Sequence, residues 1–276
     1  MMNTALTGVM SASRDLSVIS NNLANAMTVG FKRSASQFGD IMGSSQNDQP
    51  AVNIGLGTKT QVVRRSDAQG SLQQTGNVLD VALTGAGLFT YGQPGATTTE
   101  TAYSYSRAGQ LTITPTGQLT DRNSGNPIMG LPVLSNGMVG AQPQAINLTS
   151  VTGGDLTKIQ SIAIDQTGVV NVTTKDGATT KVAALAIARF PNEDGLQDQG
   201  SGQLIETAVS GPAEFGRAGS NGLGAIQQGN VEEANVDITT EMLHMIQAQQ
   251  AYNGNSRALQ TDSEMVRSAI ETLTAR

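Results

Sequence analysis

The sequence predicts an α+β protein, with N- and C-terminal helices paired as a coiled-coil layer and a central antiparallel β-rich domain between them in sequence. Three observations predict this class. In roughly the first 30 and the last 40 residues, apolar side chains recur at steps of three and four, which is the spacing of a helical face. Short alternating runs separated by turn residues fill the middle, as in an antiparallel sandwich or barrel. Glycine occupies 32 of the 276 positions, which favours many tight turns.

The first expected element is a helix within residues 1–32, which would form the N-terminal part of the helix layer. Its larger apolar residues fall on one stripe at helical spacing: Leu6, Val9, Leu16, Leu23 and Met27. Ser13 and Ser20 fill the gaps in that stripe, so it is half apolar and half small. We expect Leu6, Val9, Leu16 and Leu23 to lie at a subunit interface.

Three asparagines, Asn21, Asn22 and Asn25, stand near the end of this helix in the stretch ISNNLANAMTVGFK. Asparagine competes with the helical backbone for hydrogen bonds, so three of them in five positions need an external partner. We expect that partner to be amide-rich positions of other helices at the same interface. The alternative is local: the asparagines fray the helix end or form a turn. Gly30 is expected to stop the helix, and Phe31 to anchor the connector that follows.

The last expected element is a long helix within residues 236–276. From Ile238 a heptad seam continues to the end of the chain and contains Met242, Met245, Gln249, Tyr252, Ser256, Leu259, Ser263, Val266, Ile270 and Leu273. Asp237 is the expected N-cap, and Glu241 suits the positive end of the helix dipole. We expect the apolar members and Gln249 to lie at a subunit interface, and the matching stripes of the two helices predict that they pair.

The middle of the chain predicts a β-rich body at residues 76–210, flanked by an extended connector at 33–75 and a return connector at 211–235. Its candidate strands are the alternating runs TQVVRR, VLDVAL, QLTIT, QSIAID, VVNVTT and KVAALAIARF. The strongest hairpin signal is Asp176-Gly177, which lies between VVNVTTK and ATTKVAAL. The run VAALAIARF, residues 182–190, is too short to span a bilayer and indicates a buried strand.

The terminal helices are expected to need neighbours. Ordering about 70 terminal residues costs roughly 1–2 kcal/mol of backbone entropy per residue. About a dozen large apolar side chains return roughly 1.5–3 kcal/mol each when they are fully buried. A single pair of helices cannot bury them fully. We therefore expect the ends to be poorly ordered in a free monomer and to fold when copies of the chain pack together.

Composition excludes several classes of function. The net charge is -6 and basic residues cluster only as Lys32-Arg33 and Arg64-Arg65, which argues against nucleic acid as a partner. Cysteine is absent, so a disulfide framework or a thiolate metal site is impossible. The N-terminus lacks a basic leader followed by an apolar core, so we expect no cleaved secretory signal. No membrane insertion is expected.

The sequence predicts no catalytic site, no cofactor and no metal site. His244 is the single histidine, and no nucleophile or ligand set accompanies it at helical spacing. The glycine pairs at 55 and 57 and at 85 and 87 lack the third glycine of a nucleotide site. Acidic residues of the body stand near turn residues, which favours solvated loops, although a carboxylate pair assembled by the fold remains an alternative.

Four segments resemble, in order, the motifs of the bacterial flagellar rod and hook axial proteins. They are ISNNLANAMTVGFKR (19–33), GSLQQTGNVLDVALTGAGLF (70–89), YSRAGQLTITPTGQLTDRNSGNPIMG (105–130) and GNVEEANVDITTEMLHMIQAQQAYNGNSRALQTDSEM (229–265). Together they span nearly the whole chain. The length suits a rod subunit, because hook proteins generally carry a further β domain. VNIGLGTKTQVVRR (52–65) is similar to the connector of distal rod and hook proteins.

The resemblance implies a structural subunit of the flagellar basal-body rod, most like a distal-rod protein, that polymerises helically into a hollow shaft. It implies export by the flagellar type III apparatus with an uncleaved N-terminus, and a place in the periplasm-spanning part of the basal body. The implied partners are copies of the chain, neighbouring rod and hook proteins, and ring proteins around the rod. Alternatives are a short hook-type or proximal-rod subunit and, from other classes, a secreted β-rich adhesin or tail-like module, or a cell-wall hydrolase.

Overall fold

The computed structural model describes residues 2–42, 55–92, 103–133, 140, 142–149 and 155–274, and the chain divides into two compact units. The helix unit comprises Met1–Ala26, Lys32–Ser66 and Val236–Arg276. The β unit comprises Met27–Phe31 and Asp67–Asn235. Among the described residues, the two long helices stand at the ends of the chain and antiparallel strands form most of its middle, which confirms the predicted α+β class.

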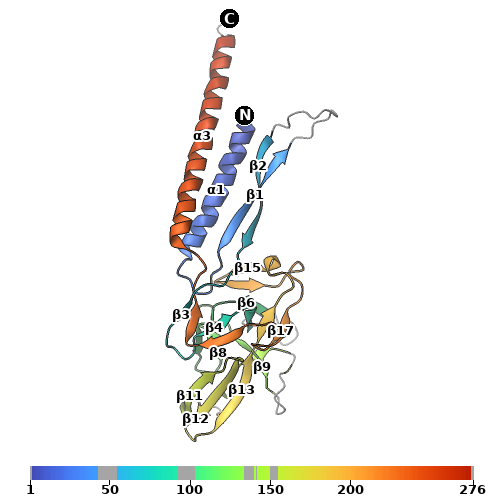
Figure 1. Cartoon of the computed structure of the whole chain (residues 1–276), viewed down its shortest axis with the longest axis vertical. Helices are drawn as coiled ribbons and strands as arrows, with labels where there is room; N and C mark the ends of the chain where they lie inside the picture. Colours follow the sequence, from blue (N-terminus) through green and yellow to red (C-terminus); the bar gives the residue numbers. More distant parts are fainter. Residues whose placement is uncertain are drawn as a thin grey trace. The chain divides into compact units, whose positions relative to one another are not determined.

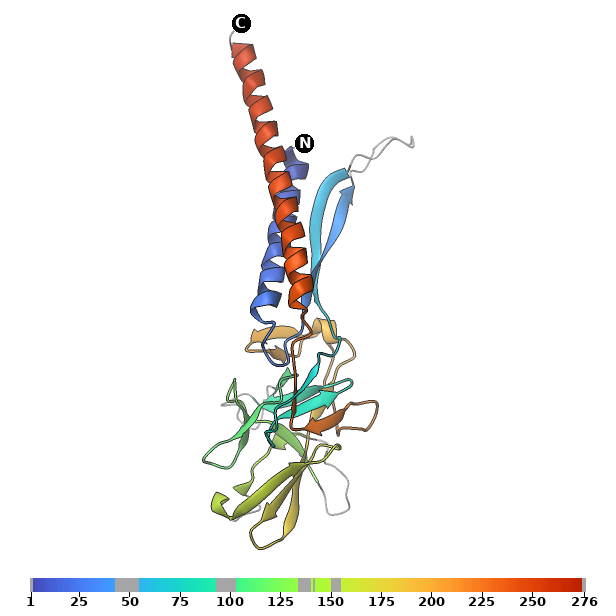
Figure 2. The ribbon, with the colours of Figure 1, turned by 60° about the vertical axis from the view of Figure 1, so that its left-hand side comes forward.

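The helix unit contains α1 (Met2–Ala24), α3 (Ile238–Thr274) and a hairpin of β1 (Ser34–Met42) and β2 (Gly55–Arg65). Figures 1 and 2 show α1 and α3 side by side and antiparallel, with the hairpin running along α1. A hydrogen bond of 2.8 Å between the hydroxyls of Ser11 and Thr58 joins α1 to the hairpin. Because α1 and α3 lie side by side within one unit, the predicted pairing of the two terminal helices is confirmed.

Local signals explain where α3 begins. The Asp237 carboxylate accepts hydrogen bonds from the backbone N–H of Thr239 (2.9 Å) and from the hydroxyl of Thr240 (3.0 Å), so Asp237 is the N-cap that the sequence predicts. These hydrogen bonds, above all the one from the Thr240 side chain, lower the pKa of Asp237.

The end of α1 differs from the expected one. The helix stops at Ala24, and turns rather than helix connect it to the region of Gly30. Gly30 is therefore not the residue that stops the helix. The polar pair Asn21 and Asn25 marks the change instead: the Asn25 amide donates to the Asn21 carbonyl at 2.9 Å and to its side-chain oxygen at 2.9 Å. Such local bonding gives the backbone an alternative to the next helical turn.

Residues 33–75 were expected to form an extended connector, but most of the described part is the β1–β2 hairpin. The ladder runs from Ser34 opposite Arg65 to Met42 opposite Gly55, with register shifts after Gln37 and before Met42. The predicted strand TQVVRR forms the second half of β2. Thus the segment packs with the terminal helices, because α1 offers the hairpin a surface that the sequence pattern did not reveal.

The β unit is built from antiparallel sheets. A five-stranded sheet has the order β10 (Gln144–Ala145), β9 (Met129–Pro132), β13 (Thr179–Leu185), β12 (Val169–Thr174) and β11 (Ile159–Ile164). A six-stranded sheet has the order β15 (Gln197–Gly200), β16 (Gln203–Ile205), β6 (Tyr103–Ser106), β5 (Leu88–Gly92), β14 (Ile187–Arg189) and β17 (Glu214–Gly216). The remaining pairs are β18 (Ala225–Gln228) with β4 (Val81–Thr84), β19 (Asn230–Glu232) with β3 (Leu72–Gln74), and β7 (Leu111–Ile113) with β8 (Leu119–Asp121). Two short 3₁₀ helices, η1 (Leu156–Lys158) and η2 (Glu193–Gly195), complete it.

Two predictions within this unit can be checked strand by strand. Asp176-Gly177 lies at the tip of the β12–β13 hairpin, as its turn chemistry predicts, and Gly177 has φ +78°. The run VAALAIARF is buried as expected but divides into β13 and β14 at Ala186. Ala186 donates to Met129 O at 3.0 Å and accepts from Thr90 N at 3.2 Å, so the chain passes from one sheet to the other there.

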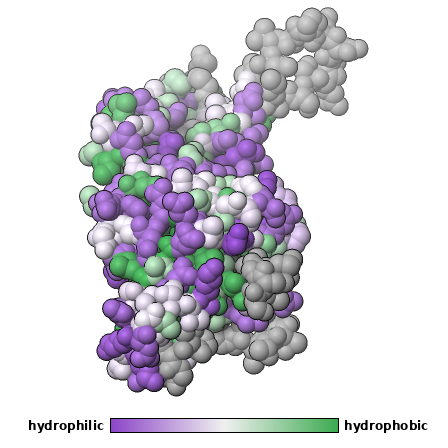
Figure 3. Space-filling model, turned by 60° about the horizontal axis from the view of Figure 1, so that its bottom comes forward, coloured by the Kyte–Doolittle hydropathy of each residue, from purple (hydrophilic) through white to green (hydrophobic). Residues whose placement is uncertain are grey.

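The segment 211–235 is more than a return connector, since β17, β18 and β19 pair with β14, β4 and β3. The main core of the β unit is formed by aliphatic side chains with Phe89 and Tyr91. The face of the molecule in Figure 3 is largely hydrophilic, with apolar side chains in small separate groups.

Candidate subunit interface

Exposed apolar side chains concentrate in the helix unit. Among the described residues, nineteen large apolar side chains are exposed, and sixteen of them belong to this unit. They are Met2, Leu6, Met10, Phe38, Leu56, Val62, Val63, Ile238, Met242, Leu243, Ile246, Tyr252, Met265, Val266, Ile270 and Leu273. The β unit exposes Met27, Val78 and Val209. Because apolar surface of this extent is normally covered by a partner, the helix unit is the candidate interface.

The C-terminal part of α3 carries the most exposed section of this surface. α3 has 37 residues and α1 has 23, and a Cβ at Gly8 would lie 2.7 Å from the Asn255 side chain. Since only a few residues of α1 precede Gly8, the last turns of α3 extend beyond α1 (Figure 2). Val266, Ile270 and Leu273 on these turns are 52%, 56% and 77% exposed.

The predicted heptad seam of α3 is thus largely solvent-facing within one chain. Met242, Gln249 and Tyr252 are exposed as well, whereas Met245 and Leu259 are half-buried. On α1, Leu6 is exposed, and Val9, Leu16 and Leu23 are half-buried. Their contact with other copies stays a prediction.

The fully buried residues of α1 and α3 lie beside the predicted stripes. The buried residues of α1 are Ala12, Ile19 and Asn22, and those of α3 are Glu241 and Ala248. The matching stripes correctly predict that the helices pair, although the fully buried residues lie beside the stripes and not on them. Small residues allow the two backbones to approach, which leaves the larger side chains on the outer surface.

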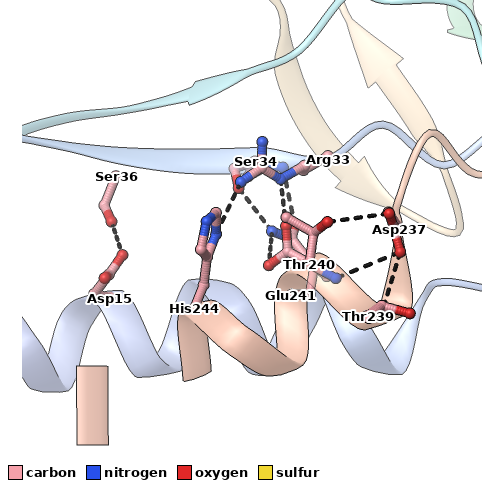
Figure 4. Close-up of polar contacts among 10 residues, drawn as sticks. Asp15, Arg33, Ser34, Ser36, Asp237, Thr239, Thr240, Glu241 and His244 are labelled. Atoms are coloured by element: carbon pink, nitrogen blue, oxygen red, sulfur yellow. Dashed lines mark hydrogen bonds and ion pairs between the residues drawn. The ribbon is translucent and has the colours of Figure 1, made fainter. Parts of the chain in front are cut away.

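A buried polar cluster joins three elements of the helix unit (Figure 4). Asn22 of α1 donates its amide to Ser34 O at 2.7 Å and accepts from Ser34 N at 2.9 Å, so it binds the start of β1 as another strand would. The Glu241 carboxylate, in the first turn of α3, forms an ion pair with the Arg33 guanidinium and lies 3.4 Å from the Asn22 amide nitrogen. Glu241 is only 1% exposed, and Arg33 is 32% exposed.

The cluster changes the interpretation of the asparagines. Asn22 is 1% exposed and its amide is satisfied inside its own chain, so it does not face another copy, contrary to expectation. Asn21 and Asn25 bond to each other, as the local alternative proposed. The spacing within the sequence could not reveal these partners, since Asn22 and Glu241 are 219 residues apart.

The same cluster lines a groove of about 420 Å³ between α1, α3 and β1. His244 lies in it with its Nδ1 3.4 Å from the Arg33 guanidinium, and the Asp15 carboxylate accepts from the Ser36 hydroxyl. Among the described residues, no group of three or more His, Cys, Asp or Glu side chains could hold a metal ion. The helices within the described ranges are also not long and apolar enough to cross a membrane.

Gly30 and Phe31 belong to the β unit and contact its backbone. Gly30 N donates to Glu232 O at 2.7 Å, and Asn235 N donates to Phe31 O at 3.3 Å. Gly30 has φ +73°, and a Cβ there would lie 2.5 Å from Ala108 N. Glycine is needed for this close approach, and the Phe31 carbonyl binds Asn235 within the same unit. Its role as anchor of the connector stays a prediction.

A second buried ion pair was not anticipated from the sequence. The Arg107 guanidinium lies 3.3 Å from Glu232 Oε2, with exposed fractions of 6% and 0%. Glu232 Oε1 also accepts from Gly70 N at 3.1 Å. One side chain therefore holds both the segment that precedes β3 and the body of the unit. The available signal was that both charged residues stand inside the quoted family-like segments.

Comparison with known proteins agrees with this arrangement at both ends of the chain. Residues 2–32 match the family model described as flagella basal body rod protein. Residues 227–272 match the model described as flagellar basal body rod FlgEFG protein C-terminal. These two ranges contain nearly all of α1 and α3.

Relatives extend the likeness over the whole chain. The flagellar basal-body rod protein FlgG of Agrobacterium fabrum is 33% identical over 274 residues, which cover 95% of this chain and 94% of the relative. FlgG of Buchnera aphidicola subsp. Baizongia pistaciae is 30% identical, with 95% of each chain covered. FlgG of Caulobacter vibrioides is 31% identical, with 98% of each covered. Identity at this level over nearly the full length shows that the chain belongs to the flagellar basal-body rod protein family.

Proposed function

We propose that this chain is a structural subunit of the distal part of the flagellar basal-body rod. Copies pack helically through the helix unit into a hollow shaft that transmits torque and passes exported subunits. Family membership and the FlgG relatives support the rod assignment. The exposed apolar surface of the helix unit supports packing through α1 and α3.

The distribution of exposed apolar side chains carries this proposal. Sixteen of the nineteen found among the described residues lie on α1, α3 and the β1–β2 hairpin. Val266 and Ile270 have about half of their surface still accessible, and covering that half is worth about 1 kcal/mol for each side chain. Summed over the set, this drives association of copies, while the sparse apolar surface of the β unit leaves it the outer, solvated part.

The remaining assignments follow from the family. Relatives are named as components of the flagellar basal body, so we place this chain there. Its neighbours along the shaft are then other rod and hook proteins. We also propose that ring proteins surround the rod at this level. The type III export apparatus would deliver the chain with an uncleaved N-terminus. A structural role also implies a chain that performs no catalysis and needs no cofactor.

The test uses two matched substitutions on α3. Val266→Asp places a carboxylate on the predicted seam, and Ser268→Asp places the same group on an exposed position of the opposite side of the helix. Purified chain is examined for tubes or short helical stacks by electron microscopy, and cells carrying each variant are scored for swimming. Val266→Asp should abolish assembly and swimming, while Ser268→Asp should preserve both. Normal assembly of the Val266→Asp protein would refute packing through this seam.

A further inference from the structure

Most of the side chains in the contact between α1 and α3 are small. Gly8 and Ala12 of α1, and Ala248 and Asn255 of α3, are small, and Ile19 is the one large apolar side chain buried on α1. Side chains on the contacting face of α3 recur every seven residues, at Glu241, Ala248, Asn255 and the half-buried Asp262. Moving α3 along α1 by seven residues, which is about two turns and roughly 10.5 Å, therefore exchanges one side chain of the contacting face for the next. Packing alone discriminates poorly between such registers.

The buried carboxylate of Glu241 does discriminate between them. In the observed register it pairs with Arg33, and it lies beside Asn22, whose amide is already bound to the Ser34 backbone. A displacement of two turns separates Glu241 from Arg33 and deprives the carboxylate of its counter-charge. Such a loss costs far more than the exchange of one small apolar contact for another.

We propose that Glu241 and Arg33 set the register of α3 against α1 and β1. Buried polar pairs of this kind select one alignment among several that apolar packing tolerates. Here the pair joins the first turn of α3 to the residue before β1, while Asn22 fixes β1 to the end of α1. One cluster thus aligns all three elements of the helix unit.

The register has a consequence for assembly, and this consequence rests on the proposed function. It determines how far the apolar residues Val266, Ile270 and Leu273 stand beyond the start of α1. A shift of two turns would move them relative to Leu6 and Met10, which are exposed on α1. Copies with different registers would then present different surfaces to their neighbours.

Disulfide trapping reads the register directly, because the chain has no cysteine of its own. Gly8→Cys with Asn255→Cys reports the observed register, since a Cβ at Gly8 lies 2.7 Å from the Asn255 side chain. Gly8→Cys with Ala248→Cys and Gly8→Cys with Asp262→Cys report displacements of two turns in either direction. Each pair is introduced into the full chain, kept dilute and oxidised briefly, and cross-linked monomer is quantified by gel electrophoresis.

The register pair is then altered in each cysteine background. Glu241→Leu with Arg33→Leu removes the charges, and Glu241→Ala is a milder alternative because Arg33 already reaches solvent. Glu241→Gln keeps an oxygen that can accept from Arg33. The matched control is Arg267→Leu with Glu271→Leu, an ion pair on the same helix whose members are 83% and 68% exposed.

We expect the 8–255 cross-link to exceed the displaced ones by about tenfold in the parent, the control and Glu241→Gln. In the double leucine variant and in Glu241→Ala the preference should fall to about threefold or less. An unchanged preference in both variants would overturn the proposal, as would a parent chain that does not favour the 8–255 pair. The cross-link forms within one chain and is read whether or not copies assemble, so failure of the proposed function would leave this result standing.

Discussion

Removal of the Glu232 carboxylate should strongly destabilise the β unit. Glu232 is completely buried, and its two oxygens accept from Gly70 N at 3.1 Å and Arg107 at 3.3 Å. In Glu232→Ala the Arg107 guanidinium, itself 6% exposed, keeps contacts to the carbonyls of Gly85 (2.8 Å) and Leu83 (3.5 Å) but loses its counter-charge. Within the part of the chain that the structure describes, its Nε has no hydrogen-bond partner.

The magnitude follows from that uncompensated charge. Breaking one side of a buried ion pair costs about 3–5 kcal/mol, a large share of the roughly 5–15 kcal/mol that stabilises a typical domain. For a unit of this size, each kcal/mol lowers Tm by about 2–4 °C, so the loss corresponds to roughly 6–20 °C. The N–H of Gly70 also loses its acceptor, which acts in the same direction.

Urea denaturation, monitored by tyrosine fluorescence, measures the decrease in the free energy of unfolding. The chain has no tryptophan, and three of its four tyrosines, Tyr91, Tyr103 and Tyr105, lie in the β unit. Glu233→Ala is the control, since its side chain is exposed and its change should stay within about 0.5 kcal/mol.

A second variant distinguishes the cost of an unpaired buried Arg107 charge from the cost of losing the contact itself. Glu232→Met with Arg107→Met removes both charges and should recover most of the stability that Glu232→Ala loses. The reasoning is refuted if Glu232→Ala costs less than about 1 kcal/mol, or if the double methionine variant is no more stable than the single one.

Two further predictions concern backbone geometry and pH. Gly30 and Gly125 share φ +73°, but a Cβ meets Ala108 N at 2.5 Å only at Gly30, with open space at Gly125. Gly125→Ala should therefore cost about 1–2 kcal/mol from φ strain, and Gly30→Ala measurably more in the same urea titration; equal losses would contradict the clash. At the α3 N-cap, hydrogen bonds led by that of the Thr240 side chain lower the pKa of Asp237 in the folded state below its ordinary value of 3.8. Its contribution is present above that value and lost as pH falls through the lower folded pKa. Helicity followed by circular dichroism should then fall more steeply with acid in the parent than in Asp237→Asn, and identical curves would count against the cap.

Features that depend on neighbours in sequence were predicted well. Asp176-Gly177 forms its hairpin because both residues suit the backbone of a tight turn, and Asp237 caps α3 because its carboxylate reaches N–H groups two and three residues on. The strands of VVNVTT and QSIAID follow from alternation over a few residues.

Features that depend on remote partners were not predicted. Asn22 binds Ser34 and lies beside Glu241, and no spacing in the sequence links these three residues. The break at Ala186 likewise arises because β9 and β5 lie on either side of it. In the candidate interface the sequence identified the apolar residues of α3 but not which of them α1 covers.

The sequence by itself determined that both ends of the chain are helical, that strands fill the middle and that the family is that of flagellar rod proteins. Tertiary structure alone decided which helical faces meet, where the hairpin packs and which carboxylates are buried. The physical reason is that periodicity reports how side chains are distributed around an element. Burial of a face depends on which neighbour can approach it closely, and here small residues and one ion pair made that choice.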